Sequence, residues 1–434
     1  MAPVSYSESK CSTQGKTGRQ VEWKLILVTG VYMMTGMLLL YLGVTGEPEP
    51  QAILVGLATV AAFLLVSLYW HFTGYQGDCF LLPVTALLFS TGLVFLFRLD
   101  PAYAVRQFVW LLAGLMALIL TTRQLVNFRF LSDYKYIYAL AGLVALILPV
   151  FFGSEQGGAK SWLYLGLFSL QPSEFVKILV VLFLASFLTE NKAVLTAGTR
   201  NLGWLSLPGP QEWGPLAVMW GISLLLLVFQ RDLGAALIYF STFLTMVYVA
   251  TSRIFYILFG LGLFVAGAGA SFYFFDHVRS RVEIWLNPWP YIETTGYQVC
   301  QSLFAINSGG VLGVGFGQGY PEYIPAVHTD FIFSAICEEM GLLGGTGVII
   351  LFMIYVFRGI RIALKTKDEF AALAASGLTA LLGLQAFIII SGVTKLLPLT
   401  GITLPYMSYG GSSLVANFIL LGLLLNISHE AYVD

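Results

Sequence analysis

The feature that most constrains this chain is a succession of apolar stretches, each long enough to cross a membrane. A spanning helix needs about 20 mostly apolar residues, and about twelve stretches meet this criterion. They cover 23–44, 52–72, 79–97, 104–121, 137–153, 172–189, 214–229, 232–250, 254–275, 331–357, 370–393 and 404–427. Backbone polar groups in hydrocarbon must be satisfied within the segment, so we expect helices rather than open sheets. The sequence predicts an all-α, polytopic transmembrane helix bundle.

The composition supports a membrane protein. Of 434 residues, 58% are hydrophobic and 10% are charged, whereas a soluble domain has roughly 25% charged residues. The net charge of −1 gives no sign of a nucleic-acid partner. The four cysteines form no CxxC pair and suit neither a zinc site nor a disulfide framework.

The distribution of lysine and arginine predicts the orientation, because cytoplasmic loops carry more positive charge. With the N-terminus inside, 14 of these residues fall on the inner side and 7 on the outer side. We therefore expect both termini in the cytoplasm. The polar segment 1–22 has no apolar core of a signal peptide, so the first helix, near Trp23, should be retained.

One connection is long, from 276 to 330, and this orientation places it outside. It is rich in Trp, Pro, Tyr and Gly, so we expect an ordered cap over the helices. Its glycines from Gly309 to Gly319 resemble a dinucleotide-binding fingerprint only superficially, because no strand context precedes them.

The first of four polar clusters on the outer face surrounds the start of the span at 172. Pro172 and Ser173 fit a helix start, and Glu174 and Lys177 share a helix face. Lys177 lies at membrane depth, where an ionisable side chain suggests a functional site. A snorkelling or paired structural lysine is the alternative. The candidates here are Lys160, Gln171, Ser173, Glu174 and Lys177.

The other clusters carry further candidates. Asp232, next to Arg231, is best interpreted as a helix N-cap. Thr329 or Asp330 could cap a helix or let an anion dock at its start, and Glu338 is a carboxylate inside a span. Small residues near Ser408 could instead serve helix packing. The candidates are Arg279, Arg281, Glu283, Glu293, Gln298, Gln301, Ser302, His328, Thr329, Asp330, Glu338, Lys395, Ser408 and Ser412.

At these residues the chain resembles the shape, elongation, division and sporulation family, which includes FtsW, RodA and SpoVE. The matching stretches are GGAKSWLYLG, QPSEFVK, RDLG, GYQVCQSLFAINSGGVLGVGFGQG, PAVHTDFIFSAICEEMGLLGG and LPYMSYGGSS. The resemblance implies about ten helices, so 23–72 would be an extra N-terminal pair before a membrane domain at 79–434.

The resemblance implies a glycosyltransferase in the bacterial cytoplasmic membrane that polymerises lipid II onto a polyprenyl-pyrophosphate-linked glycan. It implies a class B penicillin-binding protein as partner. A divalent cation, Mg or Mn, could assist the leaving pyrophosphate beside Lys177, Arg279 and Arg281.

One departure from the family concerns its presumed catalytic acid. The family's Asp corresponds to Tyr291 here, and no Asp lies between Asp276 and Asp330. Glu293 is the first candidate to replace it and Glu283 the second. The alternatives are a lipid-precursor flippase, for which we find no inverted repeat, and an inactive scaffold for the transpeptidase.

Overall fold

The computed structural model describes residues 8–43, 49–125, 128–156, 159–166, 168–197, 200–202, 205–207, 221–222, 224–225, 227 and 230–433. Within this part, 11 helices are long and apolar enough to cross a membrane. They lie in α1 (Glu8–Tyr41), α2 (Pro50–Thr73), α3 (Leu81–Leu99), α4 (Pro101–Gln124), α5 (Lys135–Phe152), α6 (Pro172–Ala197), α8 (Leu233–Thr251), α9 (Ile254–Phe274), α12 (Ile332–Lys365), α13 (Glu369–Val393) and α14 (Gly411–Val433). The expected span at 214–229 lies almost wholly outside the described residues. The predicted all-α polytopic bundle is confirmed.

Two helix starts differ by more than one turn from the sequence expectation. α1 begins at Glu8 rather than near Trp23, and Arg19 within this earlier part of the helix donates to the backbone oxygen of Tyr75 at 2.5 Å. α14 begins at Gly411 rather than near 404. The Ser408 hydroxyl accepts a hydrogen bond from the backbone N–H of Leu404 at 2.9 Å, which closes a turn where the apolar pattern suggested helix.

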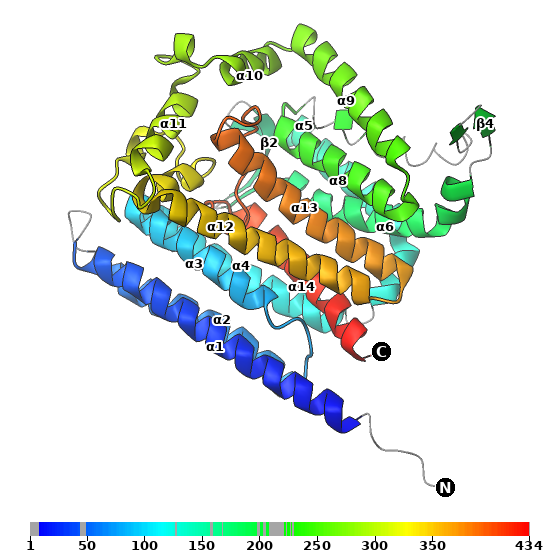
Figure 1. The fold of residues 1–434 in the computed structure, drawn as a ribbon, viewed down its shortest axis with the longest axis horizontal. Coiled ribbons are helices and arrows are strands. Elements are labelled where there is room, and N and C mark those ends of the chain that lie inside the picture. Colours follow the sequence, from blue (N-terminus) through cyan, green and yellow to red (C-terminus); the bar gives the residue numbers. More distant parts are fainter. Residues whose placement is uncertain are drawn as a thin grey trace.

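The helices form one bundle with flanking pairs (Figure 1). α1 and α2 lie along one flank against α3 and α4, while α9 and α10 extend over the opposite side. The start of α1 and the end of α14 lie at the same end of the molecule. The hydroxyl of Tyr75 donates to Asn426 on α14 at 2.9 Å, so the N-terminal pair is tied to the last helix through Arg19 and Tyr75.

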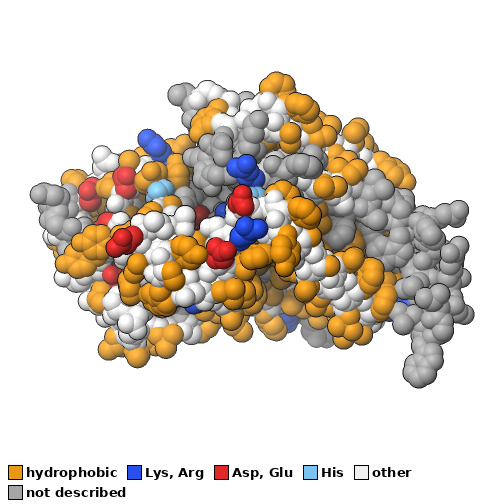
Figure 2. All heavy atoms as spheres, turned by 90° about the horizontal axis from the view of Figure 1, so that it is seen from above, with side chains coloured by type: hydrophobic (Ala, Val, Ile, Leu, Met, Phe, Trp, Pro, Cys, Tyr) orange, Lys and Arg blue, Asp and Glu red, His pale blue; other side chains and the backbone are white. Residues whose placement is uncertain are grey.

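The surface suits a lipid environment. Figure 2 shows hydrophobic side chains over much of one face, while the visible charged side chains gather in a few groups. Large apolar side chains such as Val31, Leu54 and Leu258 are exposed. A soluble protein rarely exposes so extensive an apolar surface, whereas hydrocarbon accommodates it without cost.

The strands are short and belong to connections. β1 (Ser154–Gln156), β2 (Ala159–Leu165) and β3 (Phe168–Leu170) form an antiparallel sheet in the order β1-β2-β3 between α5 and α6. β4 (Arg200–Leu202) pairs with β5 (Leu205–Leu207) after α6. These strands are much too short to span a bilayer, so the membrane part is helical throughout its described length.

The long connection is largely helical. It contains α10 (Asp276–Leu286), the 3₁₀ turns η2 (Trp289–Tyr291) and η3 (Pro321–Tyr323), and α11 (Tyr297–Gly309). The expectation of an ordered segment is confirmed, because helices and turns make up most of it.

The backbone of the glycine-rich run in this connection packs against and hydrogen-bonds to α12 where that helix is interrupted. At Gly341 the backbone leaves the helix, with φ of 65°, and Val314 N–H donates to Glu338 O at 3.0 Å. A Cβ on Gly313 would lie 2.1 Å from the backbone oxygen of Glu339. The glycines therefore serve close backbone approach, which agrees with the rejection of a dinucleotide site.

Candidate functional site

A buried lysine lies at the centre of the bundle, with partners from three helices. Lys177 Nζ on α6 donates to Glu174 Oε2 at 2.6 Å and to Gln385 Oε1 on α13 at 2.8 Å. It also contacts Asn417 Oδ1 on α14 at 3.4 Å. We call these four residues the inner polar network. Since Lys177 is only 3% exposed, the position of its charge is fixed by paired contacts and not by solvent.

A second carboxylate holds the starts of α6 and α8 together. Asp232 accepts from Gln171 Nε2 at 3.1 Å and from the Ser173 hydroxyl at 3.4 Å. It also accepts from the N–H of Ala235 at 3.0 Å, which confirms the predicted N-cap. The N–H of Gln171 in turn donates to the Ser412 hydroxyl at 3.1 Å. The predicted first cluster therefore meets the segment around Ser412.

Three members of this region were not singled out from the sequence as site residues. Gln385 and Asn417 are amides within apolar spans, and both are fully buried. A polar side chain in the middle of a spanning helix was the signal that could have identified them. Asp232 was interpreted only as a cap, yet its second oxygen belongs to the site.

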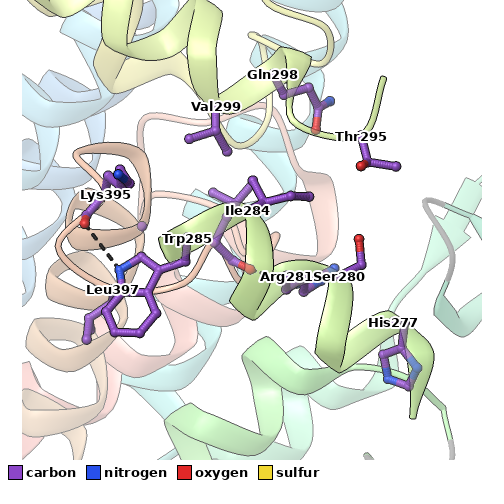
Figure 3. A pocket seen from close by; sticks show the side chains of 12 residues that line it. His277, Ser280, Arg281, Ile284, Trp285, Thr295, Gln298, Val299, Lys395 and Leu397 are labelled. Atoms are coloured by element: carbon purple, nitrogen blue, oxygen red, sulfur yellow. Dashed lines mark hydrogen bonds between the residues drawn. The ribbon is translucent and has the colours of Figure 1, made fainter. Parts of the chain in front are cut away.

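A cavity of about 270 Å³ lies between α10, the start of α11 and the segment after α13 (Figure 3). We call it the loop cavity. Arg281, Gln298 and Lys395, all predicted site residues, line it together with Trp285. The indole N–H of Trp285 donates to the backbone oxygen of Lys395 at 3.2 Å, and the two residues meet at one end of the cavity (Figure 3).

The segment 399–403 connects the loop cavity with the inner polar network. Arg281 donates to the backbone oxygen of Leu399 at 2.9 Å. Four residues further on, the backbone oxygen of Thr403 accepts from Gln385 Nε2 at 2.9 Å. The segment therefore contacts the cavity at one end and the network at the other. We call the loop cavity, the segment 399–403 and the inner polar network together the polar region.

Asp330 lies beside Arg281 at this segment. A Cβ placed on Gly401 would be 3.5 Å from Asp330 Oδ2 and 3.7 Å from an Arg281 nitrogen. Burial raises the pKa of Asp330 to about 6, although a hydrogen bond from Thr329 and the charge of Arg281 both oppose the shift. The interpretation of Thr329 or Asp330 as a plain cap is wrong, because the N-cap of α12 is Phe331, with no side-chain cap bond.

The two candidate acids differ in their surroundings. Glu293 is exposed, between η2 and the cavity-lining Thr295. Glu283 on α10 is half-buried, and its Oε2 accepts from the hydroxyl of Tyr291 at 3.4 Å. The carboxylate of Glu283 is therefore positioned beside residue 291, where the resembling family has its acid.

His328 forms part of an aromatic cluster on the same side of the bundle. Its ring stacks on Tyr103 of α4 at 4.2 Å between centroids, with an interplanar angle of 11°. Tyr409 lies against Tyr103 at 4.8 Å. Burial lowers the pKa of His328, which favours the neutral ring at pH 7.

Two predicted charges lie apart from the cavity lining. Arg279 faces Asp276 at 3.9 Å and sits over the ring of Phe272. Glu338 accepts from the N–H of Tyr320 at 3.0 Å and so holds the glycine-rich loop. This contact of Glu338 is therefore with the glycine-rich loop and not with the inner polar network.

The remaining predicted residues have varied positions. The Ser302 hydroxyl is buried against Ser334 Oγ at 2.8 Å, between α11 and α12. Gln301 is half-buried on α11. The backbone of Lys160 belongs to β2, and its side chain lies outside the described residues. Ser408 closes the turn before α14.

Within the described residues, no group of three His, Cys, Asp or Glu side chains is arranged to hold a metal ion. The predicted Mg or Mn therefore has no ready set of protein ligands in this part of the chain.

The chain is similar to known proteins along most of its length. The model of the FtsW, RodA and SpoVE family, described as cell cycle protein, matches residues 77–433. Peptidoglycan glycosyltransferase RodA of Mycobacterium tuberculosis is 44% identical over 368 residues, 82% of this chain and 78% of that protein. Stage V sporulation protein E of Bacillus subtilis is 34% identical over 365 residues, 81% of this chain and 96% of that protein.

Solved structures agree with the sequence comparison. A chain from a peptidoglycan synthase complex that coordinates polymerization and crosslinking matches with a TM-score of 0.68 at 29% identity. The match covers 82% of this chain and 99% of that one. Every residue of the inner polar network lies within the family match at 77–433. The chain therefore belongs to the FtsW, RodA and SpoVE family of multi-pass membrane proteins.

Proposed function

We propose that this chain is a peptidoglycan glycosyltransferase that polymerises lipid II into glycan strands. The observation that carries the proposal is its 44% identity to a peptidoglycan glycosyltransferase, RodA, over 368 residues. The inner polar network and the loop cavity supply what the reaction needs, namely fixed positive charge beside space for a polar head group. The spanning helices suit a substrate whose lipid tail stays in the bilayer.

The reaction is the transfer of a sugar between two lipid-linked substrates. The 4-hydroxyl oxygen of the acceptor bonds to the anomeric carbon of the donor, and the bond from that carbon to the diphosphate oxygen breaks. The hydroxyl proton passes to a carboxylate, and the diphosphate leaves as an anion. A positioned base of this kind contributes about 10²–10⁴ in rate.

We assign the base to Glu293, which is exposed near the loop cavity, with Glu283 as the second candidate. Glu283 already has a hydroxyl partner in Tyr291, which makes it less available to a substrate proton. Arg281 and Lys395 at the cavity are the cations best placed for the diphosphate. Lys177 positions the polar region from inside the bundle through Gln385 and Thr403.

We further propose that the chain works in the bacterial cytoplasmic membrane, with both termini in the cytoplasm and the loop 276–330 outside. A class B penicillin-binding protein is the proposed partner. The support is the similarity to a chain of a peptidoglycan synthase complex.

The test is a polymerisation assay with purified protein in detergent and lipid II, with and without a class B partner. The expected product is a ladder of glycan strands, which requires no sealed compartment. A flippase makes no strands in detergent but moves lipid II across sealed vesicles. Transport without strands, in the presence of the partner, would overturn the proposal in favour of the transporter.

A further inference from the structure

The aromatic cluster on the outer side of the bundle has no part in the reaction described above. Tyr103 comes from the first turn of α4, His328 from the connection before α12, and Tyr409 from the turn before α14. All three side chains are half-buried, so part of each remains accessible. The rings of Tyr103 and His328 stack at 4.2 Å between centroids, and the ring of Tyr409 lies 4.8 Å from Tyr103 at a tilt of 58°, so rings from three distant segments form one aromatic surface with two orientations.

The backbone holds this surface in place. The N–H of Tyr409 donates to the backbone oxygen of His328 at 2.8 Å. Gln107, one turn after Tyr103, donates from Nε2 to the oxygen of Ser408 at 3.0 Å and accepts from the N–H of Gly410 at 3.2 Å. The rings are therefore preorganised, which lowers the entropy cost of binding a ligand.

The aromatic cluster also lies next to the polar region. Ser412, three residues after Tyr409, accepts from the N–H of Gln171 at the start of α6. Gln171 contacts Asp232, and the inner polar network begins one turn later at Glu174. A ligand on the aromatic surface would thus lie beside the polar region.

Such a surface suits sugar rings. The face of an aromatic ring carries negative charge density, and the C–H groups on one side of a pyranose are weakly positive. Within the described residues, no hydrogen bond engages the hydroxyl of Tyr103 or of Tyr409, so both can meet sugar hydroxyls. Stacking depends little on the order of substituents, so a strand can slide along such a surface as it grows.

We propose that Tyr103, His328 and Tyr409 form a stacking subsite for the pyranose rings of a glycan strand. This inference rests on the proposed function for its biological role. The ligand class follows from the three partly accessible aromatic rings and their position beside the polar region.

The test compares Tyr103→Leu and Tyr409→Leu with the wild type in two measurements. The first is the length distribution of strands made in detergent with the partner. The second is binding of a soluble oligosaccharide of alternating N-acetylglucosamine and N-acetylmuramic acid, followed by saturation-transfer NMR. Each Leu variant should make shorter strands and bind the oligosaccharide about three- to tenfold more weakly, as loss of one aromatic contact implies.

A matched control uses another tyrosine pair, on the connection that carries His328. Tyr320 and Tyr323 stack at 5.8 Å and are exposed, so Tyr323→Leu should change neither strand length nor binding. Tyr103→Phe keeps the ring and should restore binding lost in Tyr103→Leu. Should one Leu variant fail to fold, the other carries the test.

The outcomes separate the two proposals. Wild-type strand length and binding in both Leu variants would overturn the stacking subsite while leaving the polymerase intact. A wild type that makes no strands would overturn the proposed function, and the oligosaccharide measurement would still decide the subsite.

Discussion

At the scale of single residues, the account depends on charges that the fold has removed from water. Lys177 and Glu174 form a buried pair whose remaining hydrogen-bonding capacity is met by Gln385 and Asn417. Replacing one partner of such a pair costs more stability than replacing both, because the remaining charge stays buried without a partner.

This asymmetry can separate a structural role of Lys177 from a functional one. Lys177→Met should lower the free energy of unfolding by about 3 kcal/mol, since it leaves Glu174 unpaired. The double variant Glu174→Gln, Lys177→Met should recover most of that stability. Thermal unfolding in detergent measures this difference. Polymerisation should be lost in both the single and the double variant. Wild-type activity in the double variant would show that the pair serves packing alone.

Asp330 predicts a dependence of stability on pH. Its pKa rises from 3.8 to about 6 on folding, so the folded state holds its proton more tightly than the unfolded state. The cost of burying the carboxylate therefore appears between about pH 4 and 6 and persists above. Asp330→Asn should stabilise the protein by about 3 kcal/mol at pH 8 and have little effect at pH 4.

Unfolding curves at the two pH values check this expectation. Asp276→Asn is the control, because that carboxyl is fully exposed and should show no such dependence. Equal effects of Asp330→Asn at pH 4 and pH 8 would contradict the raised pKa.

At the scale of elements, helices were predictable because twenty apolar residues have few other ways to cross a bilayer. The start of α6 at Pro172 and the cap at Asp232 also follow local rules. The late start of α14 does not, because the turn before it is held by tertiary contacts of Gln107 on α4 with Ser408 and Gly410.

The long connection shows a further limit of the sequence. Its order was predictable from composition, but the pairing of the glycine-rich run with the break at Gly341 was not, since the two segments meet only in the fold. The site shows the same limit. Polar clusters were visible in the sequence, whereas Gln385 and Asn417 became relevant only when α13 and α14 packed against α6.

The contact between the glycine-rich run and α12 leads to a prediction about Gly313. Gly313→Ala should destabilise the protein by about 3 kcal/mol, because its φ is 85° and a Cβ would clash with the backbone of Glu339. Gly347→Ala, on α12 itself, meets nothing within 4 Å and should be neutral or slightly stabilising. The melting temperatures of the two variants in one detergent test this prediction. Equal values would show that the close contact of Gly313 with α12 does not contribute to stability.

At the scale of the whole molecule, the proposal requires the polar region to face the exterior. α6 ends near the start of α13, where Lys192 and Glu369 lie 2.9 Å apart. Residues such as Lys367 fall at that end, which the lysine and arginine distribution places inside the cell. The loop 276–330 lies at the other end, with the loop cavity.

Cysteine labelling in intact cells tests this orientation. In a background without native cysteines, Thr294→Cys should react with a membrane-impermeant maleimide, because residue 294 is exposed on the long connection. Lys367→Cys, also exposed, should react only after the cells are opened. Protection of Thr294→Cys in intact cells would place the site in the cytosol and end the proposed reaction.

The central claim is that carboxylates and cations on the outer side of the bundle perform the sugar transfer. The most direct measurement is the initial rate of lipid II polymerisation by the wild type, Glu293→Gln and Glu283→Gln in the same detergent, each with the class B partner. The account predicts that Glu293→Gln slows the reaction by about 10²–10⁴, while Glu283→Gln retains most of it. A wild-type rate in Glu293→Gln would contradict the assigned base.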